Sequence, residues 1–372
     1  MCNTAVPMAI LEKPANTMSV AEEEFSGRLV TMANHATLGL MMSIGHRTGL
    51  FEALKAGGAT TSQELAGRAG LDERYVREWL GAMTTGRIVE LDRTTRRYSL
   101  PEVHAAFLGR DAANGNMAAM FQFIAVLGGV ENRIVDCFRT GGGVPYEAFD
   151  RFHEVMAEES AQTVVAALEE AIIPLVPGLD AQLQVGIDVA DIGCGSGQAL
   201  NRLAALYPNS RFTGYDLSIE AVDVANREAL ALGLTNVEFV ATDATHLPGE
   251  ARFDLIFTFD AVHDQAHPAV VLANIRRLLR PDGVYLMQDI DSASDVADNL
   301  ERPLASFIYT ISCMHCMTVS LAQGGEGLGA AWGEELALAM LKDAGFGQVE
   351  THRLEHHIMN LYYVCRWREI AG

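Results

Sequence analysis

A loop with three closely spaced glycines, Asp191-Ile192-Gly193-Cys194-Gly195-Ser196-Gly197, most strongly limits what this chain can fold into. The apolar run before the loop, 186–192, predicts a buried strand, and the amphipathic run after it, 199–207, predicts a helix. Glycine tolerates positive φ and leaves the backbone bare, so a ligand can lie against the helix N-terminus. Such a site belongs to the crevice at the strand ends of an open α/β sheet.

The spacing of the glycines separates two classes of ligand. A dinucleotide fingerprint requires glycines at positions 193, 195 and 198, but position 198 is Gln198 and the third glycine comes one residue early. The loop is therefore a poor cradle for a pyrophosphate. This weighs against a nicotinamide-dependent reductase, one of two alternative functions that the sequence leaves open.

Short β-rich runs alternate with amphipathic helical runs through the C-terminal half of the chain. This alternation predicts a seven-stranded, doubly wound α/β sheet in a domain spanning 178–372. The expected strands are 186–192, 211–215, 237–241, 253–258, 284–288, 348–353 and 361–366.

The N-terminal part predicts a smaller α-helical domain over 25–110, after a flexible arm over 1–24. Apolar spacing over 25–56 predicts two helices, and Asp72 is placed to cap a further helix that ends near Gly86. Two short alternating runs around the turn 92–95 then predict a hairpin, which completes a winged helix. A helical connector that walls a pocket is expected over 111–177.

Composition excludes several partners. The 48 Asp+Glu against 27 Lys+Arg give a formal net charge of -21, which disfavours nucleic acid and anionic membranes. No secretory signal is readable, and the most apolar stretch, 117–130, contains Gln122 and is shorter than the ~20 residues that span a bilayer. Six scattered cysteines fit a reducing compartment, so we expect a cytoplasmic protein without membrane contact.

Asp-x-Gly-x-Gly-x-Gly resembles motif I of the class I S-adenosylmethionine-dependent methyltransferases, whose sheet is Rossmann-like. In that family an acidic residue ends the second strand and binds both ribose hydroxyls, because a carboxylate can accept two hydrogen bonds from a diol. Asp216 stands at that position. Asp243, followed by Ala244, matches the residue that receives the adenine amino group.

Two later segments follow in the same family order. Residues 259–264 match the segment that borders the reactive methyl group, and 279–283 match the turn into strand five, with Asp282 where a glycine is common. The resemblance implies S-adenosylmethionine as cofactor, S-adenosylhomocysteine as product, and the cofactor-binding residues Asp191, Gly193, Cys194, Gly195, Gly197, Asp216, Leu217, Asp243, Ala244, Phe259 and Asp260.

The whole chain resembles methyltransferases of mycobacterial type that carry an N-terminal winged helix and are often labelled transcriptional regulators. The stretch 313–325, followed by Trp332-Gly333, is the most particular match. This resemblance implies a methyltransferase fold and leaves the acceptor open. The second alternative function is a ligand-responsive regulator that uses the cofactor domain as a sensor.

The winged helix itself is a weak candidate for DNA binding. Residues 60–100 hold seven arginines, no lysine and six acidic residues, which is far from a basic stripe. In small-molecule methyltransferases a similar domain dimerises and closes the partner's pocket. We therefore expect a homodimer formed through this domain, with nucleic acid an unlikely partner.

Methyl transfer requires alignment of the acceptor with the methyl group, and a general base only if the acceptor is weakly acidic. His263, after the fourth strand, is the first candidate base, and Asp264 could orient it; packing against the cofactor is the alternative role. His315, between Cys313 and Cys316, is the second candidate. Cysteine and histidine could also bind a metal, but no second ligand pair is evident unless His263 and His267 converge, so no metal is predicted.

The candidate acceptor pocket is apolar. Its predicted walls lack lysine and arginine, which favours a small, hydrophobic or aromatic acceptor. These wall residues are Phe121, Tyr146, Phe149, Phe307 and Met314.

Overall fold

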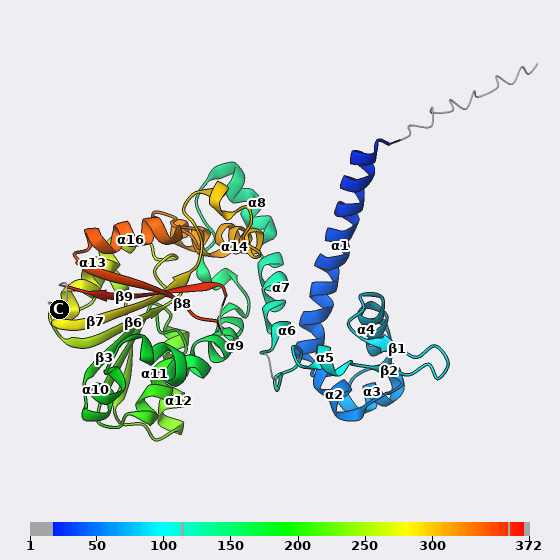
Figure 1. Ribbon diagram of the computed structural model, residues 1–372, viewed down its shortest axis with the longest axis horizontal. Coiled ribbons are helices and arrows are strands. Elements are labelled where there is room, and N and C mark those ends of the chain that lie inside the picture. Colours follow the sequence, from blue (N-terminus) through cyan, green and yellow to red (C-terminus); the bar gives the residue numbers. More distant parts are fainter. Residues whose placement is uncertain (1–17, 113–114, 356–357, 368–372) are drawn as a thin grey trace, which may run out of the picture. The chain divides into compact units, whose positions relative to one another are not determined.

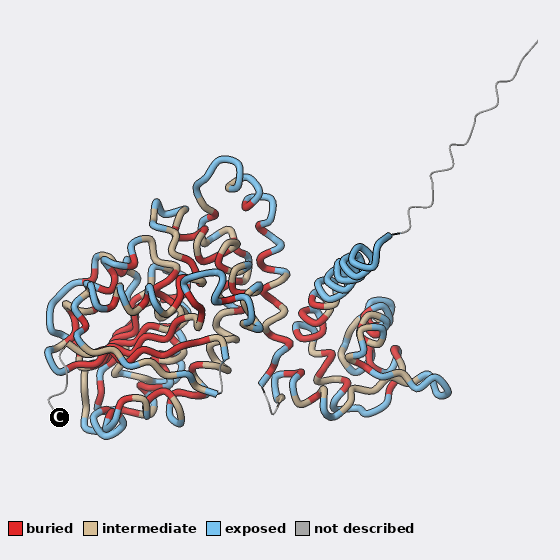
Figure 2. Tube along the Cα trace, turned by 45° about the horizontal axis from the view of Figure 1, so that its top comes forward, coloured by how far each residue is buried: buried red, intermediate tan, exposed pale blue. Residues whose placement is uncertain are grey.

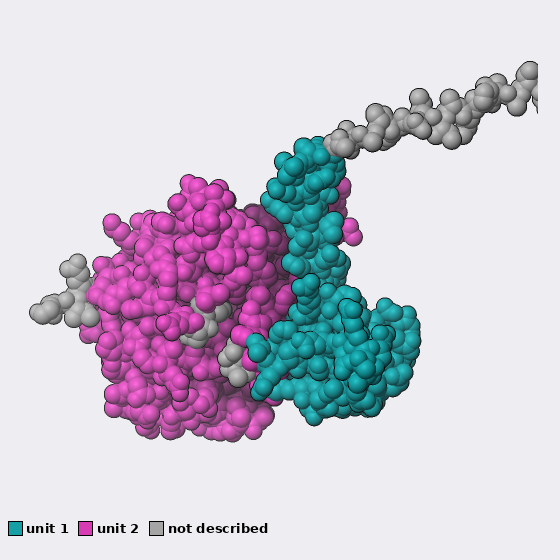
Figure 3. All heavy atoms as spheres, turned by 45° about the vertical axis from the view of Figure 1, so that its right-hand side comes forward, with its two compact units in different colours: residues 1–104 teal, residues 105–372 magenta. Residues whose placement is uncertain are grey.

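The computed structural model describes residues 18–112, 115–355 and 358–367 (Figure 1). The chain divides into two compact units, Met1–His104 and Ala105–Gly372, which Figure 3 distinguishes by colour. The first unit therefore ends six residues before the boundary expected at 110. Each unit is described by itself.

The first unit is a winged helix. Its helices begin where the sequence offers caps: Thr61 and Glu64 form a capping box at α3, and the Asp72 side chain accepts from the backbone of α4. Both strands of the wing are only two residues long. The elements are α1 (Val20–Arg47), α2 (Leu50–Gly57), α3 (Ser62–Ala69), α4 (Glu73–Thr85), β1 (Glu90–Leu91), β2 (Tyr98–Ser99) and α5 (Glu102–Ala105).

Helix α1 differs from the expected N-terminal arm. It begins at Val20, inside the predicted arm 1–24, because Ser19 and Glu22 form a capping box. The C-terminal part of α1 packs on the core of the unit, where Trp79 donates to the Met41 carbonyl at 2.8 Å. Residues 18–37 are exposed on every side (Figure 2). Residues 1–17 lie outside the described residues.

The second unit opens with the helical connector that the sequence predicts. Several short helices follow one another, including the π-helical η3 and 3-10 turns. They are α6 (Met117–Met120), α7 (Gln122–Gly128), α8 (Glu131–Thr140), η1 (Tyr146–Ala148), α9 (Phe152–Thr163), η2 (Val165–Ala167), η3 (Leu168–Ile172), η4 (Ile173–Leu175) and α10 (Leu179–Val185).

A seven-stranded sheet forms the centre of the second unit, which confirms the expected fold class. Its order is β5-β4-β3-β6-β7-β9-β8; β9 runs antiparallel to both neighbours, and the remaining pairs are parallel. The strands are β3 (Asp188–Ile192), β4 (Arg211–Asp216), β5 (Val237–Ala241), β6 (Phe253–Phe259), β7 (Leu279–Ile290), β8 (Gln348–Arg353) and β9 (Asn360–Arg366).

Helices cover both faces of this sheet (Figure 1). Alternate strand residues face opposite ways, so Val189 and Leu255 join one apolar cluster, whereas Ala190 and Ile256 join another. The covering elements after β3 are α11 (Gln198–Leu206), α12 (Ile219–Ala231), η5 (Ala244–His246), α13 (Pro268–Leu278), η6 (Val296–Asn299), α14 (Ala305–Ile311), η7 (Ser312–Cys316), α15 (Met317–Ala322) and α16 (Gly333–Asp343).

The topology fixes where a ligand can bind. From β3 the chain proceeds to β4 on one side, and β6 lies on the other, so the strand order reverses at β3. Ligands of open α/β sheets bind beyond the carboxyl ends of the strands at this reversal. The three-glycine loop follows β3 at this place.

One helical run among the described residues, Ala305–Ala322, is long and apolar enough to cross a membrane, and the bent pair Met117–Gly128 and Glu131–Thr140 passes the same test jointly. The first run is 39% buried inside the protein. Core helices of soluble proteins share these properties, so the run is weak evidence of a span.

Candidate functional site

The glycine loop turns sharply between β3 and α11. Gly193, Gly195 and Gly197 have φ angles of +79°, +52° and +74°, values that residues with side chains rarely adopt. Gly197 is the N-cap of α11. The loop therefore needs its glycines, and it directs bare backbone toward the carboxyl edge of the sheet.

Hydrogen bonds fix the loop to the end of β4. The backbone N–H groups of Gly193 and Cys194 donate to the Tyr215 carbonyl at 2.8 and 3.1 Å. The N–H of Gly195 donates to Asp216 Oδ2 at 2.8 Å. The second-strand carboxylate thus lies directly against the loop.

Two of the glycines allow a matched stability test. A Cβ on Gly197 would meet the Phe239 ring at 2.5 Å, whereas a Cβ on Gly195 would meet nothing within 4 Å. We expect Gly195→Ala to lower the free energy of unfolding by roughly 1–2 kcal/mol through backbone strain alone. Gly197→Ala should lower it by a further ~1–3 kcal/mol through overpacking. Urea unfolding of both variants measures the difference; equal effects would contradict the close packing at Gly197.

Asp191 and Asp216 flank the loop with two carboxylates. Asp191 is 2% exposed, and its Oδ1 has no hydrogen-bond partner among the residues that the structure describes. Burial and the nearby Asp216 raise the pKa of Asp191 to about 8. Asp216 Oδ1 accepts from the Ser218 N–H at 2.8 Å. A cationic ligand would relieve the repulsion between these carboxylates.

The third-strand residues lie along the same carboxyl edge. Asp243 is half exposed and caps η5, where its Oδ1 accepts from the backbone and the hydroxyl of Thr245 at 2.8 and 2.7 Å. Ala244 is buried behind it, whereas Leu217 is 59% exposed. The residues expected to bind a nucleoside therefore follow β4 and β5 in the order that the sequence predicts.

The segment after β6 is strained. Asp260 has a φ of +50°, which is uncommon for a residue with a side chain. Gln288 Nε2 donates to Asp260 Oδ2 at 2.9 Å, and Asn360 Nδ2 donates to Asp260 Oδ1. Phe259 ends β6 immediately before it. Amides from β7 and β9 therefore hold Asp260 at the head of the turn that leads to His263.

His263 is paired with a carboxylate that the sequence analysis missed. Its ring is 4% exposed, and Nδ1 lies 2.7 Å from Asp289 Oδ1. Trp332 Nε1 and the Ile290 N–H also donate to that oxygen, at 2.9 and 2.8 Å. The orienting residue is thus Asp289 at the end of β7, not the suggested Asp264, because adjacent parallel strands bring their carboxyl ends together.

The protonation of His263 depends on these neighbours. Burial disfavours the charged ring, but Asp289 and the nearby Cys316 outweigh burial and raise the pKa of His263 well above 6.5. Burial raises the pKa of Asp264 to about 7; His263 opposes this shift, and Asp289 adds to it. The site therefore gathers acidic groups around a single basic ring.

His315 occupies a different environment. It lies in the π-helical η7, is 1% exposed, and stacks on Phe152 with ring centroids 3.5 Å apart. The rings of Tyr146 and Phe149 meet it edge-on at 5.1 and 4.7 Å. Burial first, and then the nearby His263, lowers its pKa well below 6.5, so the ring is neutral.

Four of the five predicted pocket residues share one apolar cluster. Phe149 is buried in it, and Tyr146, Phe307 and Met314 pack against it. Phe121 ends α6 and is not among its members. Phe152, which stacks on His315, was not predicted; its position after a break in the helical pattern gave no signal.

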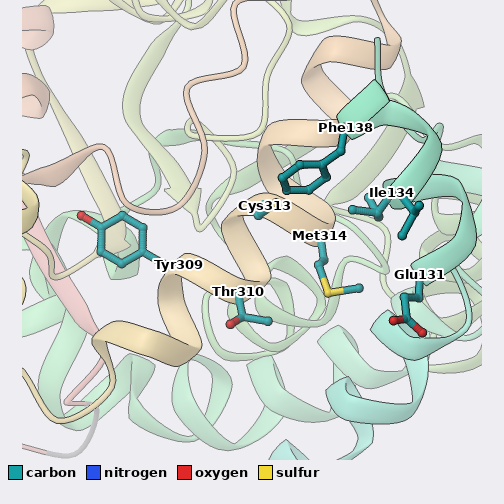
Figure 4. A pocket seen from close by; sticks show the side chains of 8 residues that line it. Glu131, Ile134, Phe138, Tyr309, Thr310, Cys313 and Met314 are labelled. Atoms are coloured by element: carbon teal, nitrogen blue, oxygen red, sulfur yellow. The ribbon is translucent and has the colours of Figure 1, made fainter. Parts of the chain in front are cut away.

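A surface groove of about 380 Å³ lies between α8 and the α14–η7 segment. Figure 4 shows its lining side chains, which are mostly apolar: Glu131, Ile134, Val135, Phe138, Tyr309, Thr310, Cys313 and Met314. Met314 is the predicted pocket residue that it contains. Neither the glycine loop nor His263 lines this groove.

Asp260, His263 and Asp289 form a group of possible metal ligands among the described residues, with ligand atoms within 4.8 Å of one another. Cys313 and Cys316 are not part of this group. The hydrogen bond between His263 and Asp289 and the amide bonds to Asp260 already engage all three side chains.

Comparison with known families agrees with this geometry. Residues 36–110 match the Rv2258c-like winged HTH domain, and residues 183–345 match a methyltransferase domain. The chain carries a winged helix and a class I methyltransferase domain. The recognition made from the motifs is thereby confirmed.

Curated relatives of the methyltransferase domain act on varied compounds. The chain is 30% identical over 142 residues to the fatty-acid O-methyltransferase of Mycolicibacterium smegmatis, covering 38% of this chain and 50% of that protein. It is 30% identical over 110 residues to (S)-coclaurine N-methyltransferase of Papaver somniferum, and the match covers 30% of this chain and 31% of that protein. The chain spans half or less of the length of these relatives.

Solved structures share the whole fold. A putative O-methyltransferase from Nostoc punctiforme has a TM-score of 0.68 at 18% identity, covering 91% of this chain and 98% of that one. Human N-acetylserotonin methyltransferase, in complex with SAM, has a TM-score of 0.66 at 17% identity. The match covers 94% of this chain and 99% of that chain. At these identities the likeness establishes the fold alone.

The cofactor of the methyltransferase domain is S-adenosylmethionine, and the residues present fit it. The loop glycines carry no Cβ and hold positive φ angles, so a ligand can approach the loop backbone closely, and the unpartnered Asp191 Oδ1 can accept a hydrogen bond. The carboxylates of Asp191 and Asp216 suit a cationic ligand that carries a diol.

Proposed function

We propose that this chain transfers the methyl group of S-adenosylmethionine to a small, hydrophobic or aromatic acceptor. The observation that carries the proposal is the His263–Asp289 pair, which lies on the same carboxyl edge of the sheet as the glycine loop. When bound, the cofactor supplies an electrophilic methyl group. The cofactor would be held by the loop glycines and Cys194, by Asp191, Asp216 and Leu217, by Asp243 and Ala244, and by Phe259 and Asp260.

In this proposal His263 takes the proton of the acceptor. Asp289 holds the ring through Nδ1 and stabilises the imidazolium that forms, as a carboxylate does beside other catalytic histidines. Nε2 is then the nitrogen that accepts the proton, because Nδ1 faces Asp289. Burial of the pair excludes water from the proton transfer.

The direct test incubates the purified chain with methyl-labelled S-adenosylmethionine and a panel of apolar phenols, alcohols, amines and acids. Label transferred to any member supports the proposal. Cofactor binding without transfer, combined with sequence-specific operator binding, would favour the regulator alternative.

The pH dependence of the reaction tests the role of Asp289. The base must be neutral, and its pKa is raised above 6.5, so activity should fall as the pH drops through a value above 6.5. Asp289→Asn removes the charge that raises this pKa, so the acidic limb should move to lower pH while the plateau falls about tenfold or more. Profiles of kcat/KM against pH measure both. Asp282→Asn, at an exposed position near the start of β7, is the control. An acidic limb that does not move in Asp289→Asn would contradict the pairing.

We also propose a homodimer formed through the first unit. An isolated helix is marginally stable in water, yet residues 18–37 are exposed all round and carry large apolar side chains. A second copy would cover them. The exposed side chains are Val20, Phe25, Leu29, Val30 and Met32.

Light scattering after size exclusion tests this assembly. The wild-type chain should elute as a dimer, and Leu29→Glu combined with Met32→Glu should yield monomers, because two charges would have to be buried in the interface. Leu230→Glu, on the 81% exposed Leu230 of α12, should remain dimeric. A monomeric wild type would refute the proposal.

The winged helix is proposed to serve assembly and not DNA binding. In a DNA-binding winged helix, α4 would be the recognition helix. Here Arg74 pairs with Glu78 and Arg77 pairs with Glu73, so acidic neighbours offset the positive charge of both arginines. A cytoplasmic location is part of the same proposal. Micromolar binding of random duplex DNA in a gel shift at low salt would contradict this role.

A further inference from the structure

His315 lacks a hydrogen-bond partner although it is almost fully buried. It is 1% exposed, and neither Nδ1 nor Nε2 has a partner among residues 18–112, 115–355 and 358–367. The rings of Tyr146, Phe149 and Phe152 surround it, and none of these residues forms a hydrogen bond with it. An unpaired buried polar group costs roughly 1–3 kcal/mol, which a bound ligand could recover.

The position of His315 indicates which class of ligand could bind to its ring. The N–H of Gly329 donates to the His263 carbonyl at 2.9 Å, and Gly329 lies against Ser312 and Met317, which flank His315 in the chain. The next residue after His315, Cys316, acts on the charge of His263. The charge of His263 also acts on His315. The two imidazoles therefore lie near each other, and a ligand that reaches His315 reaches the base. A neutral imidazole offers one donor and one acceptor, which suits a hydroxyl group.

The charges around the two rings limit the ligand further. Asp216 interacts with Asp191 and with Asp264, and Asp264 also interacts with Asp289. The cationic ring of His263 is already paired with Asp289, and no lysine or arginine of the described chain forms an ion pair with any of these four carboxyl groups. Tyr146, beside His315, is acted on by Asp264 and Asp216. Another carboxylate brought into this partly buried cluster would be repelled, whereas an uncharged hydroxyl would not be.

We infer that His315 and its three rings form an acceptor subsite that recognises an uncharged, hydroxyl-bearing apolar molecule and rejects the corresponding carboxylate. This inference rests on the proposed function. His315 is thus a recognition residue and not a second base. The subsite separates this chain from a relative named for fatty-acid methylation.

Titration calorimetry with a matched pair of probes tests the subsite. 2-Naphthol and 2-naphthoic acid share a flat apolar body, and at pH 7.5 the first is uncharged and the second is a carboxylate. The full-length protein, saturated with S-adenosylhomocysteine, should bind 2-naphthol at least about tenfold more tightly than 2-naphthoate. Equal or tighter binding of the acid would overturn the inference, as would binding of neither probe.

Two variants assign the preference to His315. His315→Phe keeps a flat ring without polar atoms and should weaken 2-naphthol binding about tenfold, whereas His315→Gln keeps a donor and an acceptor and should stay within about threefold of wild type. Both should bind S-adenosylhomocysteine as wild type does, which reports an intact fold. Unchanged 2-naphthol binding by His315→Phe would overturn the assignment. Failure of the wild type to bind S-adenosylhomocysteine would instead refute the proposed function.

Discussion

Replacing His263 by alanine is expected to lower kcat about 10²- to 10⁴-fold, the usual contribution of a general base. The ring is buried in the loop after β6 and bonded to Asp289, and alanine removes this pair. Because the cofactor is proposed to bind through other residues, its dissociation constant should stay within about threefold of wild type. Single-turnover kinetics and calorimetry separate the two quantities.

The control for this prediction comes from the same loop. His267 lies four residues later with its side chain 48% exposed, so His267→Ala should leave kcat unchanged. A His263→Ala enzyme with near wild-type kcat would remove the base from the mechanism and leave positioning as the main source of rate. Such a result would fit an acceptor that is already deprotonated or a strong nucleophile.

The strands of the second unit could be predicted because buried parallel strands are nearly continuous apolar runs. Ile192, for example, ends both the expected and the observed strand before the loop. The antiparallel insertion of β9 between β7 and β8 could not be predicted in this way. The apolar patterns of 348–353 and 361–366 predict two strands. They do not predict which strands pair with each other, because pairing depends on contacts between residues distant in sequence.

The cofactor half of the site could be predicted because its residues follow single strands within a few positions. The His263–Asp289 pair could not, because its partners are 26 residues apart on different elements. Asp289 did carry a signal, since it follows an apolar run as Asp191 and Asp260 do. The sequence carried no signal for the aromatic surroundings of His315, because Phe152 contacts His315 only through tertiary packing.

The start of α1 could not be predicted from the sequence for a different reason. Ser19 and Glu22 form a capping box, yet the mixed composition around them predicted an arm. A capping box favours a helix only if apolar residues of the helix are later covered. The apolar residues that follow it are exposed, so no core of the described chain covers them.

Replacing Asp216 by asparagine is expected to weaken S-adenosylmethionine binding at least tenfold. The proposed contact is a carboxylate that accepts from a ribose diol, and hydrogen bonds to a charged group contribute roughly 1.5–3 kcal/mol each. Asparagine keeps the shape but replaces one accepting oxygen by a donor. It also removes the negative charge that, beside Asp191, favours a cationic ligand.

Asparagine tests the cofactor contact of Asp216 better than alanine does, because Asp216 also stabilises the fold through hydrogen bonds. Its two oxygens accept from the backbone of Gly195 and Ser218 at 2.8 Å, and alanine would release both the loop and the start of α12. Unfolding free energy measured beside cofactor affinity separates these effects, and Asp223→Asn, on an exposed face of α12, controls for lost charge. Removing the charge of Asp216 should also lower the pKa of Asp191. An Asp216→Asn enzyme with unchanged affinity and stability would place the ribose elsewhere along the edge, because neither the diol nor the sulfonium could then depend on this carboxylate.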